Sequence, residues 1–141
     1  MANDGKAAER AFERHWRQIG HLERFPDKRD LIGLNQGRRV ADFPKPSDYL
    51  VSSSGIPLHY AEVKSTEAKN RFAFSKIRPK QSEAALKSVV RGDGKYIFYI
   101  FSYHLGRWFT MPASQYARLV EAGERSVQFS ELNEWKPSGL T

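Results

Sequence analysis

The sequence predicts an α/β domain whose mixed β-sheet is flanked by helices. Three observations predict it: apolar residues at helical spacing near the N-terminus, two pairs of β-prone segments joined by turn residues, and two further helical segments that each begin at a proline. This alternation of helices and strand pairs is typical of a sheet covered by helices. Because 141 residues suffice for one hydrophobic core, we expect residues 1–141 to fold as a single domain.

The first half of the chain is expected to contain a helix and a β-hairpin. Phe12, Ile19 and Leu22 recur at helical spacing, which predicts an amphipathic helix from residue 6 to about Arg24. The β-prone segments at residues 48–51 and 58–64 flank a Ser- and Gly-rich turn cluster, which predicts the hairpin.

Two less regular stretches border this hairpin. Residues 31–34 are expected to form a short strand or to hold a loop against the core. Phe72 and Phe74 alternate with polar neighbours, which predicts a brief strand or an extended connection. These two rings and that of Trp16 could stack on bases, but we expect all three in the core.

The second half is expected to supply the centre of the sheet. Pro79 suits the first position of a helix that runs to about Val90. Residues 96–101 are a nearly continuous run of β-branched and aromatic residues, typical of a strand covered on both faces. Residues 108–111 are its expected hairpin partner, and Pro112 is expected to open the last helix.

The composition excludes several classes of protein. The sequence contains no cysteine, which excludes disulfides and thiolate zinc sites. Its longest apolar or aromatic stretch, residues 96–101, is far shorter than the roughly 18 residues of a membrane span. The N-terminus lacks the apolar segment of a secretory signal. We therefore expect a soluble, cytoplasmic protein without a membrane partner.

Basic residues are concentrated in one fifth of the chain. Between Lys64 and Arg91 there are eight basic residues against two acidic ones, which accounts for most of the formal net charge of +7. Such an excess suits a polyanionic partner, because Lys and Arg neutralise backbone phosphates without sequence preference. A solvated basic face is the alternative interpretation.

Two acidic residues and a lysine in the expected hairpin suggest a metal site. Glu62 and Lys64 lie two residues apart in one strand, so both side chains project from the same face. Cross-strand pairing can bring Asp48 beside Glu62. A bound Mg²⁺ would remove the repulsion between the carboxylates, and the Lys64 ammonium could act on a scissile phosphate beside it. The alternative is a solvated ion pair on a surface hairpin.

Several segments together resemble the RecU-type Holliday junction resolvases, a branch of the PD-(D/E)xK nucleases. The resemblance covers about residues 45–119. It rests on residues 45–49 (KPSDY), 60–66 (YAEVKST), 71–75 (RFAFS) and 111–114 (MPAS), together with Ile77 and Gln81. It implies a restriction-endonuclease-like core for the α/β domain.

The resemblance also implies roles for individual residues. Those that match the family's catalytic positions are Asp48, Glu62, Lys64, Glu9 and Gln81, and the implied metal ligands are Asp48, Glu62 and Val63. The implied cofactor is Mg²⁺, with Mn²⁺ able to substitute. Glu13 is the alternative to Glu9, and either glutamate could instead be an exposed partner of a neighbouring arginine. Gln81 could instead be an ordinary polar residue at a helix N-terminus.

The sequence departs from the family in the stalk that engages the junction centre. The family carries this stalk between its first two strands, whereas here only the short segment at about residues 33–44 is available for it. Arg38 and Arg39 could form a reduced stalk tip that contacts DNA phosphates, or could be solvated loop residues. The residues expected to bind DNA are Arg38, Arg39, Lys69, Arg71, Lys76, Arg78 and Lys80.

These observations together predict a Mg²⁺-dependent, structure-selective DNA endonuclease that resolves four-way junctions. Two symmetric cuts require two related sites, so a homodimer is expected. Its small size also suits a phage-encoded enzyme. The alternatives are another PD-(D/E)xK nuclease that nicks or cuts duplex DNA, and a non-catalytic DNA-binding protein. The four histidines are scattered, and no catalytic role is expected for them.

Overall fold

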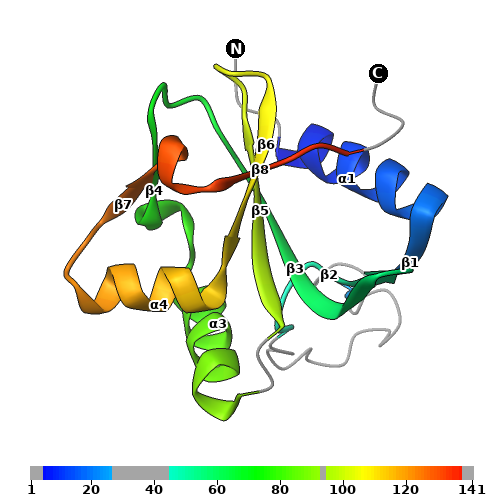
Figure 1. Cartoon of the computed structure of the whole chain (residues 1–141), viewed down its shortest axis with the longest axis horizontal. Helices are drawn as coiled ribbons and strands as arrows, with labels where there is room; N and C mark the ends of the chain where they lie inside the picture. The colour runs from blue at the N-terminus through cyan, green and yellow to red at the C-terminus, as the bar shows by residue number, and fades with distance from the viewer. Residues whose placement is uncertain (1–4, 27–44, 93–94, 138–141) are drawn as a thin grey trace, which may run out of the picture.

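The computed structural model describes residues 5–26, 45–92 and 95–137 (Figure 1). The expected segment at residues 31–34 lies outside the described residues, as do Arg38 and Arg39.

A six-stranded sheet forms the centre of the molecule (Figure 1). Its strands, in spatial order, are β1 (Gly20–Arg24), β2 (Tyr49–Ser53), β3 (Ile56–Thr66), β5 (Tyr96–Ser102), β6 (Arg107–Pro112) and β8 (Asn133–Trp135). Strands β3 and β5 pair in parallel, whereas the other neighbouring pairs are antiparallel. The sheet is therefore mixed, as the sequence predicts. A separate antiparallel pair joins β4 (Arg71–Ala73) to β7 (Ser126–Gln128).

Helices cover both faces of this sheet. They are α1 (Gly5–Ile19), α3 (Pro79–Arg91) and α4 (Ala113–Glu121), with the short 3₁₀ helices η1 (Phe74–Lys76) and η2 (Phe129–Glu131). Figure 1 shows α1 on one side of the sheet, and α3, α4 and the β4–β7 pair on the other. No helix within the described ranges is both long enough and apolar enough to span a membrane.

The first helix is shorter than predicted, and the expectation that it continues to Arg24 is wrong. Helix α1 ends at Ile19, and β1 follows at once and pairs with β2. Gly20 lies so close to β2 that a Cβ atom there would clash with the carbonyl oxygen of Ser52. Leu22, which we expected on the apolar face of a helix, instead alternates with exposed neighbours along the strand. Pairing along the edge of the sheet therefore overrides the local helical pattern.

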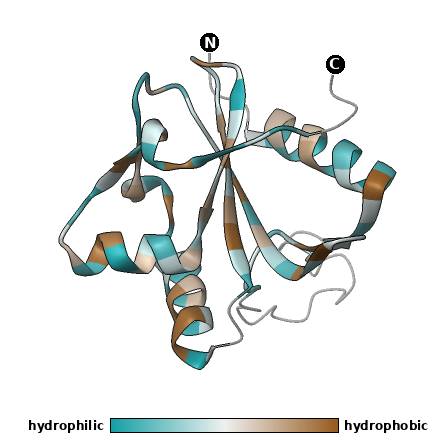
Figure 2. Cartoon of the chain, viewed as in Figure 1, coloured by the Kyte–Doolittle hydropathy of each residue, from teal (hydrophilic) through white to brown (hydrophobic). Residues whose placement is uncertain are grey.

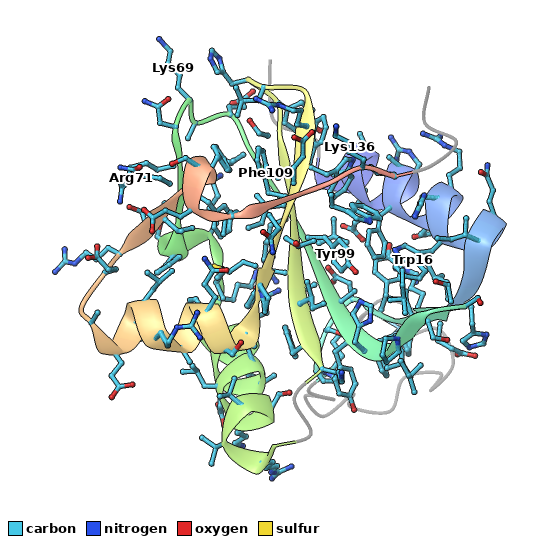
Figure 3. All side chains as sticks on the ribbon, in the orientation of Figure 1. Trp16, Lys69, Arg71, Tyr99, Phe109 and Lys136 are labelled. Atoms are coloured by element: carbon cyan, nitrogen blue, oxygen red, sulfur yellow. The ribbon has the colours of Figure 1, made fainter. Side chains whose placement is uncertain are left out.

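Two hydrophobic cores lie on opposite faces of the sheet. The core beneath α1 consists largely of aromatic residues, including Phe12, Trp16 and Tyr99, and Figure 3 shows Trp16 and Tyr99 on this side. The other core lies beneath α3 and α4 and contains Phe72 and Phe74. The expectation that Phe72, Phe74 and Trp16 are core residues is confirmed. In Figure 2 hydrophobic residues follow β5, the strand between these two layers.

A buried histidine lies in the aromatic core beneath α1. His59 is 3% exposed, and its Nδ1 lies 2.9 Å from the carbonyl oxygen of Pro57. A carbonyl only accepts, so Nδ1 carries the proton and Nε2 accepts the hydroxyl of Tyr99 at 2.8 Å. Burial lowers the pKa of His59 below its ordinary value of 6.5. The folded protein therefore favours a neutral imidazole.

We expect His59 to make the protein less stable in mildly acidic solution. The unfolded chain takes up the proton at a higher pH than the folded chain does, so the stabilisation is complete above about pH 6.5 and is lost as the pH falls. The loss should approach 1.4 kcal/mol per pH unit, as an order of magnitude. Urea unfolding at pH 7.5 and 5.5 should show a smaller pH dependence in His59→Gln than in the wild type. His104→Gln, in an exposed turn, is the matched control, and an unchanged dependence in His59→Gln would refute the assignment.

Candidate active site

The β2–β3 hairpin brings Asp48 to the middle of β3. Tyr49 pairs with Ala61, so Asp48, which directly precedes β2, lies beside the next residues of β3. The backbone N–H of Val63 donates to Oδ2 of Asp48 at 3.0 Å. Ala61 and Val63 are buried in the core beneath α1. Because neighbours along a strand alternate, Glu62 and Lys64 project from the opposite face.

Asp48, Glu62 and Lys64 form a largely buried charged cluster. The side chain of Glu62 is 2% exposed, and those of Asp48 and Lys64 are each 14% exposed. Nζ of Lys64 lies 3.6 Å from Oε2 of Glu62. Burial raises the pKa of Glu62 well above its usual range, the negative charge and hydrogen bonding of Asp48 raise it further, and the Lys64 ammonium opposes them. The two carboxyl groups therefore lie close enough to disfavour full ionisation.

Gln81 connects this cluster to the N-terminus of α3. Its Nε2 donates to Oε2 of Glu62 at 3.0 Å, and its Oε1 accepts from Nζ of Lys64 at 2.7 Å. The same Oε1 accepts the backbone N–H of Arg78 at 2.9 Å, which is the capping interaction expected of a glutamine at this helical position. One amide thus caps the helix and orients both Glu62 and Lys64.

Helix α1 brings two glutamates to the same cavity. Glu13 accepts the hydroxyl of Tyr49 at 2.6 Å and pairs with Arg17 at 3.1 Å, so it already has structural partners. Glu9 lines the cavity, and its pKa is raised by burial and, next, by the negative charge of Asp48. Both glutamates therefore line the cavity, and Glu13 is the one whose carboxyl group is engaged by Tyr49 and Arg17.

Three further residues hold Asp48 in place, and sequence reasoning gave them no role. Oη of Tyr96 donates to the carbonyl oxygen of Pro46 at 2.6 Å. Oγ of the buried Ser47 donates to the carbonyl oxygen of Tyr49 at 2.7 Å. Nζ of Lys45 lies 3.4 Å from Oδ1 of Asp48. The i, i+3 spacing of Lys45 and Asp48 is a local signal, whereas the contact made by Tyr96 depends on the tertiary fold.

The cluster lines a basic cavity of about 560 Å³ between α1 and the start of α3. Of the residues expected to bind DNA, Lys76 and Arg78 line this cavity, and Lys80 lines a neighbouring one. Lys69 lines a third cavity instead, and Arg71 donates to Ser126 at 2.8 Å. Figure 3 shows Lys69 and Arg71 on the side of the molecule away from α1. The other basic residues of the main cavity are Lys6, Arg10, Arg24, Lys45 and Lys64.

The donor set is compatible with a hard divalent cation. Mg²⁺ usually binds to one or two carboxylates and completes its coordination with water and substrate phosphate. Asp48 and Glu62 supply two carboxylates that otherwise repel each other. Within the described part of the chain, no three His, Cys, Asp or Glu side chains form a metal-binding group. The two carboxylates of Asp48 and Glu62 fit a site that leaves coordination positions to water and substrate.

The comparisons with known proteins concern the fold. No family model and no curated protein matches the sequence. Among solved structures, the chain is similar to Archaeoglobus fulgidus Hjc, a Holliday junction resolvase from an archaeal hyperthermophile. The two share 15% sequence identity with a TM-score of 0.57, and the match covers 92% of this chain and 94% of that chain. The predicted fold class is thereby confirmed: the chain has the mixed α/β fold of this nuclease, with helices on both faces of the sheet.

Proposed function

We propose that this protein is a Mg²⁺-dependent DNA endonuclease that resolves Holliday junctions. The observation that carries the proposal is the convergence of Asp48, Glu62 and Lys64 in one basic cavity, with Gln81 bridging the last two. The likeness of the fold to an archaeal junction resolvase supports the same reading. A protein that only bound DNA would gain nothing from two buried carboxyl groups that repel each other.

The metal would be held by the carboxylates of Asp48 and Glu62, together with the backbone carbonyl of Val63. When bound, Mg²⁺ supplies Lewis-acid activation of the phosphodiester and of the attacking water. Mn²⁺ should substitute, because it prefers the same oxygen ligands. The pKa of Glu62 is raised first by burial and next by repulsion from Asp48, and the cation would offset that repulsion.

The chain's own residues would orient the reactants and stabilise developing charge. Lys64, held by Gln81 at 2.7 Å, places a positive charge beside the position where negative charge grows on the scissile phosphate. Glu9 would complete the acidic side of the cavity from α1. Water would attack phosphorus in line with the leaving 3′ oxygen, and the bond to that oxygen would break as the new P–O bond forms. The proton lost by the water ends on the 3′ oxygen, which gives a 3′-hydroxyl, and the resemblance to resolvases implies that the other product is a 5′-phosphate that can be ligated.

Selectivity for four-way junctions, assembly as a RecU-type homodimer and a phage origin are the finer parts of the proposal. Two symmetric cuts need two sites related by a twofold axis. Lys76 and Arg78 line the cavity and are suited to neutralise backbone phosphates around the scissile bond. Such contacts carry no sequence preference, so recognition would depend on DNA shape.

We expect a four-way junction to be cleaved in Mg²⁺ at least about tenfold faster than a duplex of matched sequence, which corresponds to about 1.4 kcal/mol of discrimination. Cleavage should cease in excess EDTA and return when Mg²⁺ or Mn²⁺ is added. The assay uses end-labelled strands and measures single-turnover rates for both substrates. Equal rates would assign the protein to duplex-cutting nucleases, and binding without cleavage would indicate a non-catalytic module.

A further inference from the structure

A second basic cavity adjoins the candidate active site. Its volume is about 390 Å³, and it is lined by one face of α3 and by Tyr60 and Tyr96 from the sheet. Lys45 lines both this cavity and the one that contains Asp48 and Glu62. Lys45 is therefore a wall residue common to both cavities.

The wall formed by α3 carries a stripe of positive charge. Lys80, Lys87 and Arg91 all line the cavity, and their i, i+7, i+11 spacing puts them within about 40° of one another around the helix. The stripe is roughly 16 Å long at 1.5 Å per residue. With Lys45 the cavity has four basic residues, whereas Glu83 is the one acidic residue in its described lining. Glu83 pairs with Lys87 at 2.9 Å, which leaves a clear positive excess.

The wall of the cavity opposite α3 is fixed by burial and by a hydrogen bond. Tyr96 is 1% exposed and donates to the carbonyl oxygen of Pro46 at 2.6 Å, and the ring of Tyr60 lies 6.1 Å from that of Tyr96. One wall is therefore cationic, and the other is aromatic and braced by the segment that precedes Asp48. The cationic wall suits the phosphates of a nucleic-acid strand, and the partly exposed ring of Tyr60 suits its sugar and base surfaces.

We infer that a DNA strand in the candidate catalytic cavity continues along α3, where Lys80, Lys87 and Arg91 bind the phosphates on one side of the scissile bond. The inference rests on the proposed nuclease function, and it assigns a DNA-binding role to Lys45, Lys87 and Arg91. Phosphates recur every 3.4 Å of helix axis along one strand, so a stripe of roughly 16 Å spans several of them. Lys45 lies where the flanking strand enters the catalytic cavity.

The first test measures the salt dependence of binding for the double variant Lys87→Ala/Arg91→Ala. Affinity for a labelled four-way junction is determined in EDTA at several NaCl concentrations, so that no cleavage occurs. Each lost phosphate contact should make the slope of log K against log salt concentration shallower by about 0.9. The slope of the double variant should therefore be shallower than that of the wild type by about 1.8. Arg118→Ala/Arg125→Ala removes the same charge from exposed positions that line neither cavity, and it should leave the slope unchanged.

The second test locates the contacts on the DNA. Single phosphates on either side of the cleavage site are replaced by neutral methylphosphonates, and binding is measured for both proteins. Neutral linkages on one flank should weaken binding by the wild type several-fold and leave the Lys87→Ala/Arg91→Ala variant unaffected. An unchanged salt slope, or equal sensitivity of both proteins to every linkage, would overturn the inference.

These tests distinguish a failure of the α3 contact from a failure of the proposed nuclease function. If the wild type cleaves DNA in Mg²⁺ but the double variant keeps the full salt slope, the α3 contact fails and the nuclease assignment stands. If the slope changes as expected but the wild type does not cleave, the α3 contact stands and the nuclease assignment fails.

Discussion

Replacing Asp48 by asparagine is expected to reduce junction cleavage about a thousandfold or more, because a metal's contribution of several kcal/mol corresponds to that factor. A neutral amide is a poor ligand for Mg²⁺ compared with a carboxylate. The fold should survive, since an asparagine oxygen can still accept the Val63 N–H that now donates to Asp48 at 3.0 Å. Binding to a junction in EDTA should therefore remain close to that of the wild type while cleavage is lost.

The same variant should also differ from the wild type in thermal stability, which can be measured without catalysis. The negative charge of Asp48 contributes to the raised pKa values of both Glu62 and Glu9, so removing it relieves repulsion in metal-free buffer. Asp48→Asn should then be at least as stable as the wild type in EDTA. Mg²⁺ should raise the melting temperature of the wild type but not that of the variant, because only a ligand of the folded state stabilises it.

Glu67→Gln provides the control for loss of one negative charge. Glu67 follows β3, is exposed, and lines neither basic cavity. The Glu67→Gln variant should retain wild-type cleavage and the wild-type increase in melting temperature with Mg²⁺. Undiminished cleavage by Asp48→Asn, or an equal Mg²⁺ response in both variants, would show that Asp48 does not hold the metal.

The hairpin that carries the candidate active site could be predicted because its signals are local. Glu62 and Lys64 share a face through the two-residue period of a strand, which needs no tertiary information. The turn at Gly55 lies in a cluster of small polar residues, and its φ of +80° is one that glycine adopts readily. Once this turn joins the two strands, pairing of Tyr49 with Ala61 places Asp48 next to Val63.

Contacts between distant parts of the chain could not be predicted in this way. The sequence predicts Tyr96 only as part of a central strand, yet its hydroxyl donates to the carbonyl oxygen of Pro46, fifty residues earlier. The strand β1 was missed because Ile19 and Leu22 fit a helix, and only pairing with β2 decides otherwise. Local propensity is a weak guide wherever a sheet edge offers backbone partners.

The role of Gln81 illustrates how a local and a distant contact combine. Its position near the start of α3 is readable from Pro79, and a glutamine there is a common capping residue. That the same amide also binds Glu62 and Lys64 follows from the way α3 approaches the end of β3. The two interpretations that the sequence left open for Gln81 are therefore compatible.

Phe12→Ala is expected to lower the free energy of unfolding by about 3–5 kcal/mol, the usual cost of removing a fully buried phenylalanine. Phe12 is 0% exposed, and its ring centroid lies within 6.3 Å of those of five other aromatic residues, the closest being Tyr99 at 4.9 Å. Natural domains have only about 5–15 kcal/mol of stability, so this loss is a large fraction. Chemical denaturation monitored by tryptophan fluorescence would measure it.

The same substitution should also weaken the candidate active site, because Phe12 is one of the buried residues that hold α1 against the sheet. Glu9 lines the candidate catalytic cavity from that helix, and Glu13 joins the helix to β2 by accepting the hydroxyl of Tyr49 at 2.6 Å. Phe12→Leu keeps most of the buried surface and should show a smaller loss in both stability and cleavage, even if the alanine variant does not fold. Val90→Ala removes an aliphatic side chain that is 86% exposed and should change stability by no more than about 0.5 kcal/mol. A Phe12→Ala protein as stable as the Val90→Ala control would mean that α1 is held to the sheet by its polar contacts rather than by the aromatic core.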